Sequence, residues 1–369
     1  MTGGDLVEEI RRLGREAGLE AVGICVADPF DDARRTIEAR KESGESAGMQ
    51  FTFRRPERST DPAVTMPGAR ALVVGARSYL RQAPAGPRSG REARVARYSW
   101  VDHYEPLRRA LGQIAARLED DGWRARVLVD DNALVDRAAA VRAGLGWFGK
   151  NANVLLPGRG SWFVLGSVLT DAPIAPDGAP QPVPDGCGTC RRCMVDCPTG
   201  ALVGPGHLDA RRCLAWLLQA PGVFPPEFRE ALGDRLYGCD ECQERCPVNR
   251  KARLSGGPPP AEDHSQAVLS LLQVLGAPDA GLEELVGRWY IPGRQLRYVR
   301  RNALVVIGNV GDPADPDVVA ALVRYLADPD PLLRAHAVWA AHRLGRDDLL
   351  EAVVADDPLV TAELRRAGR

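Results

Sequence analysis

The spacing of the cysteines constrains this chain more than any other feature. A first run contains Cys187, Cys190, Cys193 and Cys197, separated by two, two and three residues and followed by Pro198. Bacterial ferredoxins have this spacing: the first three thiolates bind one [4Fe–4S] cluster, and the fourth ligates a second cluster. We therefore expect a second set of cysteine ligands elsewhere in the chain.

A second run supplies that set. It consists of Cys239, Cys242 and Cys246, followed by Pro247, and Cys213 lies between the two runs. The crossover of ligands predicts one cluster on Cys187, Cys190, Cys193 and Cys246 and another on Cys197, Cys213, Cys239 and Cys242. Two structural zinc sites are the alternative, but the first run does not have a zinc-ribbon spacing. Cys25 lies outside both runs, in an apolar segment, and is expected to be a core residue.

The composition indicates a globular protein without a membrane segment. The chain has 48 basic and 49 acidic residues, a net charge of -1, which excludes a globally basic nucleic-acid binder but not a local basic patch. No segment reaches the roughly 20 apolar residues of a membrane helix, and the charged N-terminus does not resemble a signal peptide. We expect a cytoplasmic protein, in which cysteines are ligands more often than disulfides.

Residues 1–175 alternate between helical and strand-like segments. Helical spacing covers residues 6–17 and 107–118, and apolar runs at 71–75, 126–129 and 161–169 indicate buried strands. This alternation predicts an α/β layered domain over 1–175.

The rest of the chain predicts two further domains. After a segment rich in Pro and Gly at 172–186, we predict a ferredoxin-like two-cluster domain at 176–255. Residues 262–369 look all-helical, and residues 299–311 match 333–345 with a period of 34. This repeat is typical of HEAT-type helical hairpins, with a generic helical bundle as the alternative. The predicted fold class is therefore a multidomain α+β protein.

Several blocks outside the cysteine runs resemble the epoxyqueuosine reductases, a family of tRNA-modifying enzymes. The resemblance covers about residues 1–250. It rests on the following blocks: Arg97-Tyr98 with Asp102, Val129-Asp130 with Asp136-Arg137, Ala143 to Trp147 with Gly149-Lys-Asn151, Gly160 to Phe163, Thr199 to Ala201, Asp209 to Cys213, and Tyr237 to Cys242. Many ferredoxins share the cysteine runs, whereas their combination with the upstream blocks is much more specific.

The resemblance implies a cobalamin bound in the N-terminal domain beside the clusters. It also implies reductive removal of the epoxide oxygen from epoxyqueuosine at the wobble position of tRNA, in the last step of queuosine formation. The expected partners are a tRNA anticodon stem-loop and an external low-potential electron donor, and the expected state is a monomer. Cobalamin and the clusters then carry the redox chemistry, while the protein orients and protonates the substrate.

The resemblance also assigns roles to individual residues. Asp130, at the end of the predicted strand 126–129, matches a proposed general acid, although an aspartate after a strand is otherwise a cap or turn residue. Cobalamin contacts are implied for Tyr98, Asp102, Gly146, Trp147, Lys150, Asn151, Ser161 and Trp162. Without the resemblance, Lys150 is a solvated turn lysine and the two tryptophans are core residues.

A local basic segment is the candidate for binding tRNA. Residues 288–301 contain five arginines and no acid, and Arg294, Arg297, Arg300 and Arg301 are expected to contact phosphates. A solvated helix face is the alternative.

Three positions depart from the family's pattern: Tyr104, Ala133 and Ser167. These departures leave open that the chain is a related corrinoid reductase that acts on another substrate. An electron-transfer subunit is a further alternative, but a relay alone would not need the N-terminal domain.

Overall fold

The computed structural model describes residues 3–84, 89–174, 176, 181–254, 258–261 and 265–368. Part of the segment at 172–186 therefore lies outside the described residues. The chain folds into two units: unit 1 combines Met1–Gln82, Asp102–Arg211 and Glu241–Pro260, and unit 2 combines Ala83–Val101, Arg212–Asp240 and Ala261–Arg369. These units differ from the three domain ranges predicted from the sequence, which remain a prediction.

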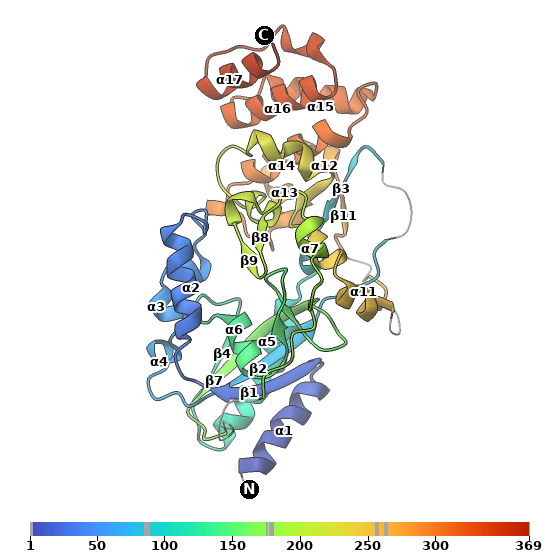
Figure 1. The fold of residues 1–369 in the computed structure, drawn as a ribbon. Helices are drawn as coiled ribbons and strands as arrows, with labels where there is room; N and C mark the ends of the chain where they lie inside the picture. The colour runs from blue at the N-terminus through green and yellow to red at the C-terminus, as the bar shows by residue number, and fades with distance from the viewer. Residues whose placement is uncertain are drawn as a thin grey trace. The chain divides into compact units, whose positions relative to one another are not determined.

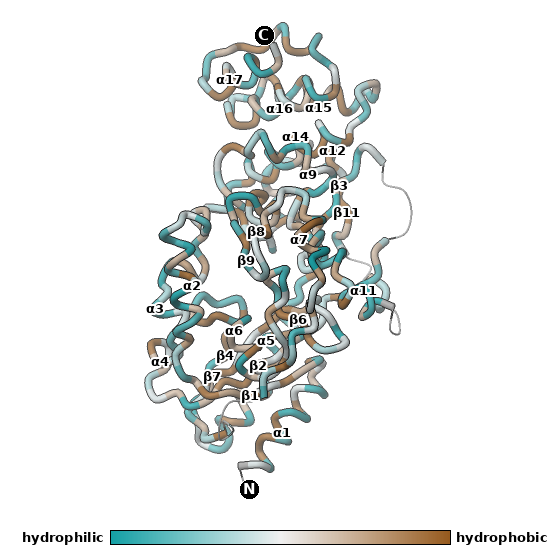
Figure 2. Tube along the Cα trace, viewed as in Figure 1, coloured by the Kyte–Doolittle hydropathy of each residue, from teal (hydrophilic) through white to brown (hydrophobic). Residues whose placement is uncertain are grey.

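A four-stranded sheet forms the centre of unit 1 (Figure 1). Its strands lie in the order β1 (Ala21–Val26), β2 (Ala71–Ser78), β7 (Phe163–Thr170) and β4 (Ala125–Val129), and each neighbouring pair is antiparallel. Apolar residues follow these strands (brown in Figure 2), because helices cover both faces of the sheet and the central strands are buried.

Glycines in the strands let these helices pack closely. Helices α1 (Gly3–Glu16) and α5 (Tyr104–Asp120) cover one face, where a Cβ atom at Gly75 would lie 3.0 Å from Leu111 of α5. Helix α6 (Asp136–Arg142) covers the other face, where a Cβ atom at Gly23 would lie 2.4 Å from the carbonyl oxygen of Ala143. Larger residues at these two positions would separate helix from sheet.

The three strands and two helices expected from the sequence are all present in unit 1, at β2, β4, β7, α1 and α5. The expected α/β type is not found, since the sheet has no parallel pair among the described strands. Alternation of helices and strands along a chain does not determine strand direction, so the unit is of the α+β type.

The remaining elements of unit 1 are short, apart from α2, which has 12 residues. They are α2 (Asp31–Glu42), the 3-10 helix η1 (Phe51–Phe53), α3 (Pro56–Ser59), α4 (Pro62–Thr65), β5 (Trp147–Phe148), β6 (Val154–Leu155), α7 (Arg192–Val195), β8 (Leu202–Gly204), β9 (His207–Leu208), α10 (Glu241–Glu244) and α11 (Pro247–Leu254). The cysteine runs lie around α7 and α10.

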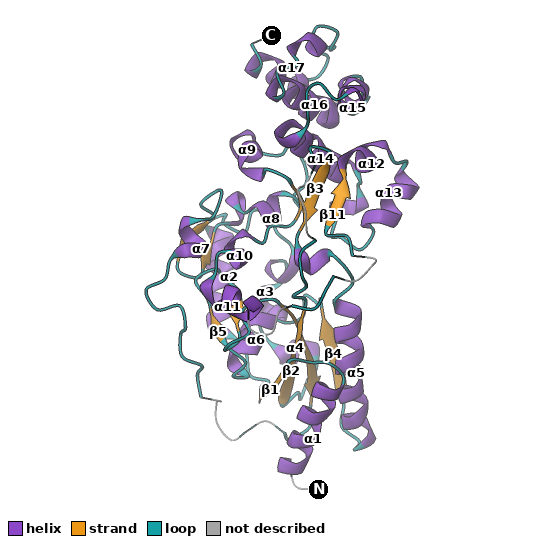
Figure 3. Cartoon of the chain, turned by 90° about the vertical axis from the view of Figure 1, so that its right-hand side faces the viewer, coloured by secondary structure: helices purple, strands orange, loops and turns teal. Residues whose placement is uncertain are grey.

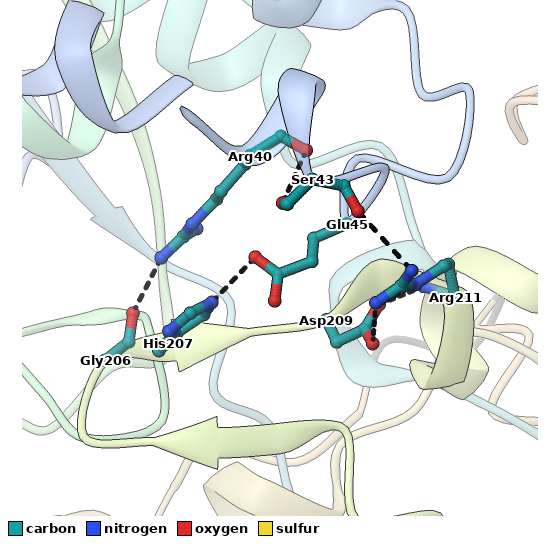
Figure 4. A network of polar contacts seen from close by, with 7 residues as sticks. All are labelled: Arg40, Ser43, Glu45, Gly206, His207, Asp209 and Arg211. Atoms are coloured by element: carbon teal, nitrogen blue, oxygen red, sulfur yellow. Dashed lines mark hydrogen bonds and ion pairs between the residues drawn. The ribbon is translucent and has the colours of Figure 1, made fainter. Parts of the chain in front are cut away.

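A polar network joins the β8–β9 hairpin, which follows the first cysteine run, to the end of α2 (Figure 4). Arg40 donates to the carbonyl oxygen of Gly206 at 3.1 Å, and His207 Nε2 lies 2.8 Å from a Glu45 oxygen. The hydrogen bond from His207 lowers the pKa of Glu45. The hairpin is thereby held at two points along its length.

Unit 2 combines a small sheet with stacked helices (Figure 3). The strands lie in the order β10 (Arg235–Tyr237), β3 (Glu92–Val95) and β11 (Val268–Ser270). The helices are η2 (Arg97–Ser99), η3 (Ala210–Arg212, which ends at the border of the unit), α8 (Leu214–Leu217), η4 (Pro226–Phe228), α9 (Arg229–Leu232), α12 (Leu271–Gly276), α13 (Asp279–Val286), η5 (Pro292–Arg294), α14 (Arg297–Val310), α15 (Pro316–Leu326), α16 (Pro331–Arg343), η6 (Asp347–Leu350) and α17 (Pro358–Arg366).

The last helices begin with the same local signal. Asp315, Asp330 and Asp357 each accept a hydrogen bond from the second helical residue and are followed by proline. An aspartate N-cap followed by proline at the first helical position favours a helix start. Helices α14 and α16 occupy the two matching segments of the predicted repeat, and Ala303 and Ala337 are fully buried at equivalent positions.

One expectation for this region was wrong. Residues from 262 onward were expected to be all-helical, but β11 pairs antiparallel with β3, with Leu269 opposite Ala93. The strand has three residues and its partner lies far upstream, so no local periodicity indicates it. No helix in the described part of the chain is long and apolar enough to cross a membrane.

A buried ion pair joins α9 to α17 within unit 2. Arg229 is fully buried, Glu363 is 4% exposed, and Nη2 of the arginine lies 2.9 Å from Oε1 of the glutamate. Arg366 also donates to Glu363, at 2.6 Å. Removing one partner of such a pair leaves an uncompensated buried charge.

We predict that Glu363→Ala destabilises unit 2 by about 3–5 kcal/mol, because Arg229 then remains charged and enclosed. Denaturant unfolding followed by circular dichroism measures the loss, with Glu227→Ala at an exposed position as the control. Equal stability of the two variants would contradict this role of the pair.

Candidate iron–sulfur and acid site

Unit 1 brings the four cysteines of the first predicted cluster together. Cys187 and Cys190 lie in the loop before α7, Cys193 lies on α7, and Cys246 lies between α10 and α11. Burial raises the pKa of the Cys193 thiol to about 11, and the other three cysteines add to the shift, which shows that all four are near neighbours. Burial likewise raises the pKa of Cys246, with Cys187 and Cys190 contributing.

This arrangement fits a cluster rather than a reactive thiol. A raised pKa means that a free thiol stays protonated, whereas an iron cluster binds thiolates and compensates their charge. Among the described residues, no three His, Cys, Asp or Glu side chains form a group that could hold a single metal ion. Four neighbouring thiols are the number of protein ligands that a [4Fe–4S] cluster takes.

The second predicted set is divided between the two units. Cys197 and Cys242 belong to unit 1, and Cys213 and Cys239 belong to unit 2. Cys197 Sγ accepts a hydrogen bond from the Ala201 amide at 3.3 Å, a kind of contact that stabilises cluster thiolates. The assignment of these four residues to one cluster remains a prediction.

Cys25 has the role expected from the sequence. It is fully buried on β1, and burial raises the pKa of its thiol to about 12, so it stays uncharged in the core.

Asp130 ends β4 in an unusual conformation. Its φ of 52° lies in the left-handed region, which is uncommon for residues other than glycine. Desolvation raises the pKa of its carboxyl, Arg108 opposes this, and Asp131 and Asp102 add to it. Although the residue remains exposed to solvent, the surrounding chain therefore favours the protonated carboxyl. A strained turn that presents an acid with a raised pKa is a common feature of functional sites.

A second acid, Asp136, lies near Asp130 and begins α6. Burial raises the pKa of its carboxyl to about 8, Arg137 opposes the shift, and Asp130 and Asp131 add to it. The sequence analysis used Asp136 only as part of the resemblance and did not predict a site role. The only sequence signal was that Asp136 follows the candidate acid Asp130 by six residues. The desolvation that raises the pKa of Asp136 depends on tertiary packing.

The residues expected to contact cobalamin differ in accessibility. Asp102 is exposed and caps α5 through the Tyr104 and Glu105 amides at 2.9 Å. Lys150 is partly exposed and donates to the carbonyl oxygen of Gly188. Tyr98 belongs to unit 2, where its hydroxyl accepts from Gln219 at 3.1 Å. Their cofactor contacts remain predictions.

The other expected cobalamin contacts are buried inside unit 1. Gly146, Asn151, Ser161 and Trp162 have little or no exposed surface. In this conformation they are enclosed by protein, and their contact with a cofactor remains a prediction. A Cβ atom at Gly146 would lie 2.0 Å from the Leu155 carbonyl oxygen, so that glycine is explained by close backbone packing. Trp147 is also buried and packs against Cys246.

Ser161 instead joins the second cysteine run to the sheet. Its amide donates to Asn249 Oδ1 at 2.6 Å, and its hydroxyl accepts from Gln243 Nε2 at 3.0 Å and Asn249 Nδ2 at 2.9 Å. Gln243 also donates to the Tyr79 hydroxyl at 2.9 Å. The sequence analysis missed Gln243 and Asn249, because buried amides next to cysteine ligands have no sequence signature.

Two of the three positions that depart from the family's pattern are internal. Ala133 is 1% exposed and Ser167 is fully buried in β7, whereas Tyr104 is partly exposed. Ala133 and Ser167 thus belong to the packing of unit 1 rather than to an open surface.

The four arginines expected to bind tRNA do not share one environment. Arg294, Arg297 and Arg300 pair with Glu283, Asp330 and Asp279 at 3.0, 2.6 and 2.6 Å. Arg301 is fully buried and donates to the carbonyl oxygens of Ala220 and Gly222 at 2.8 and 2.6 Å. The prediction for Arg301 is therefore wrong: its guanidinium satisfies buried carbonyls that a surface residue cannot reach.

Comparison with known proteins agrees with this architecture. Family models match residues 59–131 (epoxyqueuosine reductase QueG, DUF1730), 186–249 (4Fe-4S double cluster binding domain) and 294–367 (HEAT repeats). The epoxyqueuosine reductase of Bacillus cereus is 32% identical over 94% of this chain and 91% of its own length. That of Bacillus subtilis is 32% identical over 98% and 91%.

Solved structures extend the similarity to the whole fold. A crystal structure of epoxyqueuosine reductase with an epoxyqueuosine-modified tRNA-Tyr stem loop has a TM-score of 0.88 and 30% identity, and covers 99% of this chain and 98% of that chain. The Streptococcus thermophilus enzyme has a TM-score of 0.86 with 30% identity and covers 98% of both chains. This chain belongs to the epoxyqueuosine reductase family. The family models confirm the predicted double-cluster segment and the HEAT repeats.

We predict that Cys193→Ser in this member of the epoxyqueuosine reductase family removes one of two clusters and about half of the bound iron. Iron and sulfide analysis after anaerobic reconstitution measures the loss. Cys25→Ala is the matched control, because that cysteine is buried but lies outside the site, and it should keep the full iron content. Full iron in Cys193→Ser would contradict the ligand assignment.

A second prediction concerns the pH dependence of stability. The pKa of Asp136 is raised to about 8 in the folded chain, above roughly 3.9 in an unfolded chain. The folded state therefore holds an extra proton between these values, and stability falls as pH rises through that window, by at most about 1.4 kcal/mol per pH unit.

Asp136→Asn should remove this decline. Denaturant midpoints at pH 5 and pH 8 test it, with Asp120→Asn at the exposed end of α5 as the control. If Asp136→Asn loses as much stability between the two pH values as the wild type and the control do, the Asp136 carboxyl does not hold its proton.

Proposed function

We propose that this chain reduces epoxyqueuosine in tRNA to queuosine, with electrons passing through two [4Fe–4S] clusters to a cobalamin. The observation that carries the proposal is the agreement of a full-length family relationship with the convergence of Cys187, Cys190, Cys193 and Cys246 in unit 1. The external low-potential electron donor, the monomeric state and the cytoplasmic location expected from the sequence remain predictions.

Cobalamin would supply a cobalt centre that stores the electrons that the clusters deliver one at a time. The described residues fit this group in part. Asp102 and Lys150 keep exposed surface in unit 1, as does the side chain of Phe148, which is 51% exposed between Gly146 and Gly149. A large apolar ring in solvent beside two glycines is suited to lie against a flat ligand.

Asp130 would provide the proton that the departing epoxide oxygen requires. A general acid must carry its proton near the working pH, and desolvation raises the pKa of this carboxyl in that direction. The left-handed turn holds Asp130 at the exposed end of β4, whereas Asp136 is only partly exposed.

Arg294, Arg297 and Arg300 would contact the tRNA backbone from unit 2. Arg297 and Arg300 line an open cleft together with Arg324. On binding tRNA, each of these three arginines would exchange its carboxylate partner for a phosphate. Without tRNA, the carboxylates balance the charges of the arginines. Such contacts predict binding that weakens as salt concentration rises.

The direct test uses protein reconstituted anaerobically with iron, sulfide and cobalamin. After spectra establish that both cofactors are bound, a strong reductant and epoxyqueuosine-containing tRNA are added, and digested nucleosides are analysed by mass spectrometry. Loss of one oxygen is expected. No conversion by fully loaded protein would reject the tRNA substrate and favour a reductase of another molecule. Failure to bind cobalamin would favour an electron relay.

We predict that Asp130→Asn lowers conversion by about 10²–10⁴-fold, the usual contribution of a general acid, without loss of either cofactor. Single-turnover assays measure this, and Asp131→Asn is the matched control because Asp131 is the adjacent acid and accepts a hydrogen bond from the Ala133 amide. Comparable activity of the two variants would show that the proton comes from another group.

A further inference from the structure

Trp147 lies beside the first set of cysteines in unit 1. It forms β5 and pairs with Leu155 of β6. Its side chain is 8% exposed and clusters with Leu155 and Cys246, against which Val183, Cys187 and Val248 also pack. Two of its neighbours are therefore expected cluster ligands, and the others are apolar.

The six-membered ring of the Trp147 indole lies against the loop that carries Cys187. A Cβ atom at Gly186 would lie 2.6 Å from Cζ2 of Trp147 and 3.3 Å from Cε2, the carbon bonded to Nε1. Only glycine allows this approach, since a methyl group at that position would collide with the ring. Cη2 would lie 2.9 Å from the same Cβ position, so the six-membered ring, with Cε2 next to the N–H group, lies against the residue just before Cys187.

That N–H group has no partner within the described part of the chain. Trp147 Nε1 is fully enclosed and donates no hydrogen bond there. Buried indole N–H groups usually find an acceptor, because an unpaired buried donor loses its hydration without compensation. Leu155, Val183 and Val248 have no polar side-chain atoms, so the acceptors that these neighbours offer through their side chains are sulfur atoms.

We propose that the indole N–H of Trp147 donates a hydrogen bond to a sulfur of the [4Fe–4S] cluster bound by Cys187, Cys190, Cys193 and Cys246, and thereby raises its reduction potential. When this cluster takes up one electron from an external reductant, its negative charge increases. A donor aimed at its sulfur stabilises the reduced form more than the oxidised form. The inference requires the double-cluster segment but not the tRNA substrate.

The test is a reductive titration of the reconstituted full chain followed by electron paramagnetic resonance, without tRNA or cobalamin. Trp147→Phe keeps an aromatic ring and removes the donor. We expect one of the two cluster couples to become more negative by about 59 mV, which corresponds to a roughly tenfold change in a one-electron equilibrium. The other couple should not move.

Trp123→Phe is the matched control, because Trp123 lies in the turn between α5 and β4 and should leave both potentials unchanged. Iron and sulfide content establishes that each variant holds both clusters. Unchanged potentials in fully loaded Trp147→Phe would overturn the proposal, whether or not the chain reduces tRNA.

A second measurement decides the question if Trp147→Phe fails to assemble its clusters. Wild-type protein labelled with ¹⁵N in the indole of tryptophan is reduced and studied by pulsed electron paramagnetic resonance, in water and in deuterium oxide. A ¹⁵N coupling together with an exchangeable proton coupling is expected, both retained in Trp123→Phe. Absence of both couplings in the reduced wild-type protein would overturn the proposal.

Discussion

The buried hydrogen bonds between Ser161, Gln243 and Asn249 are the contacts on which the cluster site depends. They hold the second cysteine run against the start of β7, so that Cys246 lies beside the first run. Gly160, with a φ of 76°, has room for no side chain because a Cβ atom would lie 2.1 Å from Asn249 Oδ1. Loop closure between distant runs is unfavourable in entropy. A buried polar network specifies one register of this contact, since any shift would leave its donors and acceptors unpaired.

Burial of the thiols couples folding to cluster binding. The same enclosure that brings Cys193 and Cys246 together raises the pKa of both side chains. Without metal, burial therefore disfavours the thiolate forms of Cys193 and Cys246. An iron cluster reverses this balance by supplying the positive charge, so its binding free energy adds to the stability of unit 1. Cys25 shows the contrast: it has a similarly raised pKa but no thiol neighbours, and serves only as a core residue.

The sequence predicted those features that depend on local spacing. Strands β2, β4 and β7 and the repeat of α14 and α16 follow from patterns within short windows, and all appear where expected. The double-cluster segment also follows from local spacing, and a family model matches it. What depends on tertiary environment was not predictable. Arg301 lies in a segment that has the composition of a basic surface patch. In the fold its side chain is buried and donates hydrogen bonds to carbonyl oxygens. Strand direction in unit 1, the pairing of β11 and the enclosure of Asp136 likewise depend on residues far away in the sequence.

The two acids near the end of β4 have different environments and therefore different protonation. Asp130 is exposed to solvent, and the charge of Arg108 favours its charged form, whereas desolvation raises the pKa of the partly exposed Asp136 to about 8. The charges of Asp130 and Asp131 add to the raised pKa of Asp136. While Asp136 is neutral it adds no negative charge beside Asp130. The loss of the proton from Asp130 itself is made less favourable by the negative charges of Asp131 and Asp102 and more favourable by Arg108.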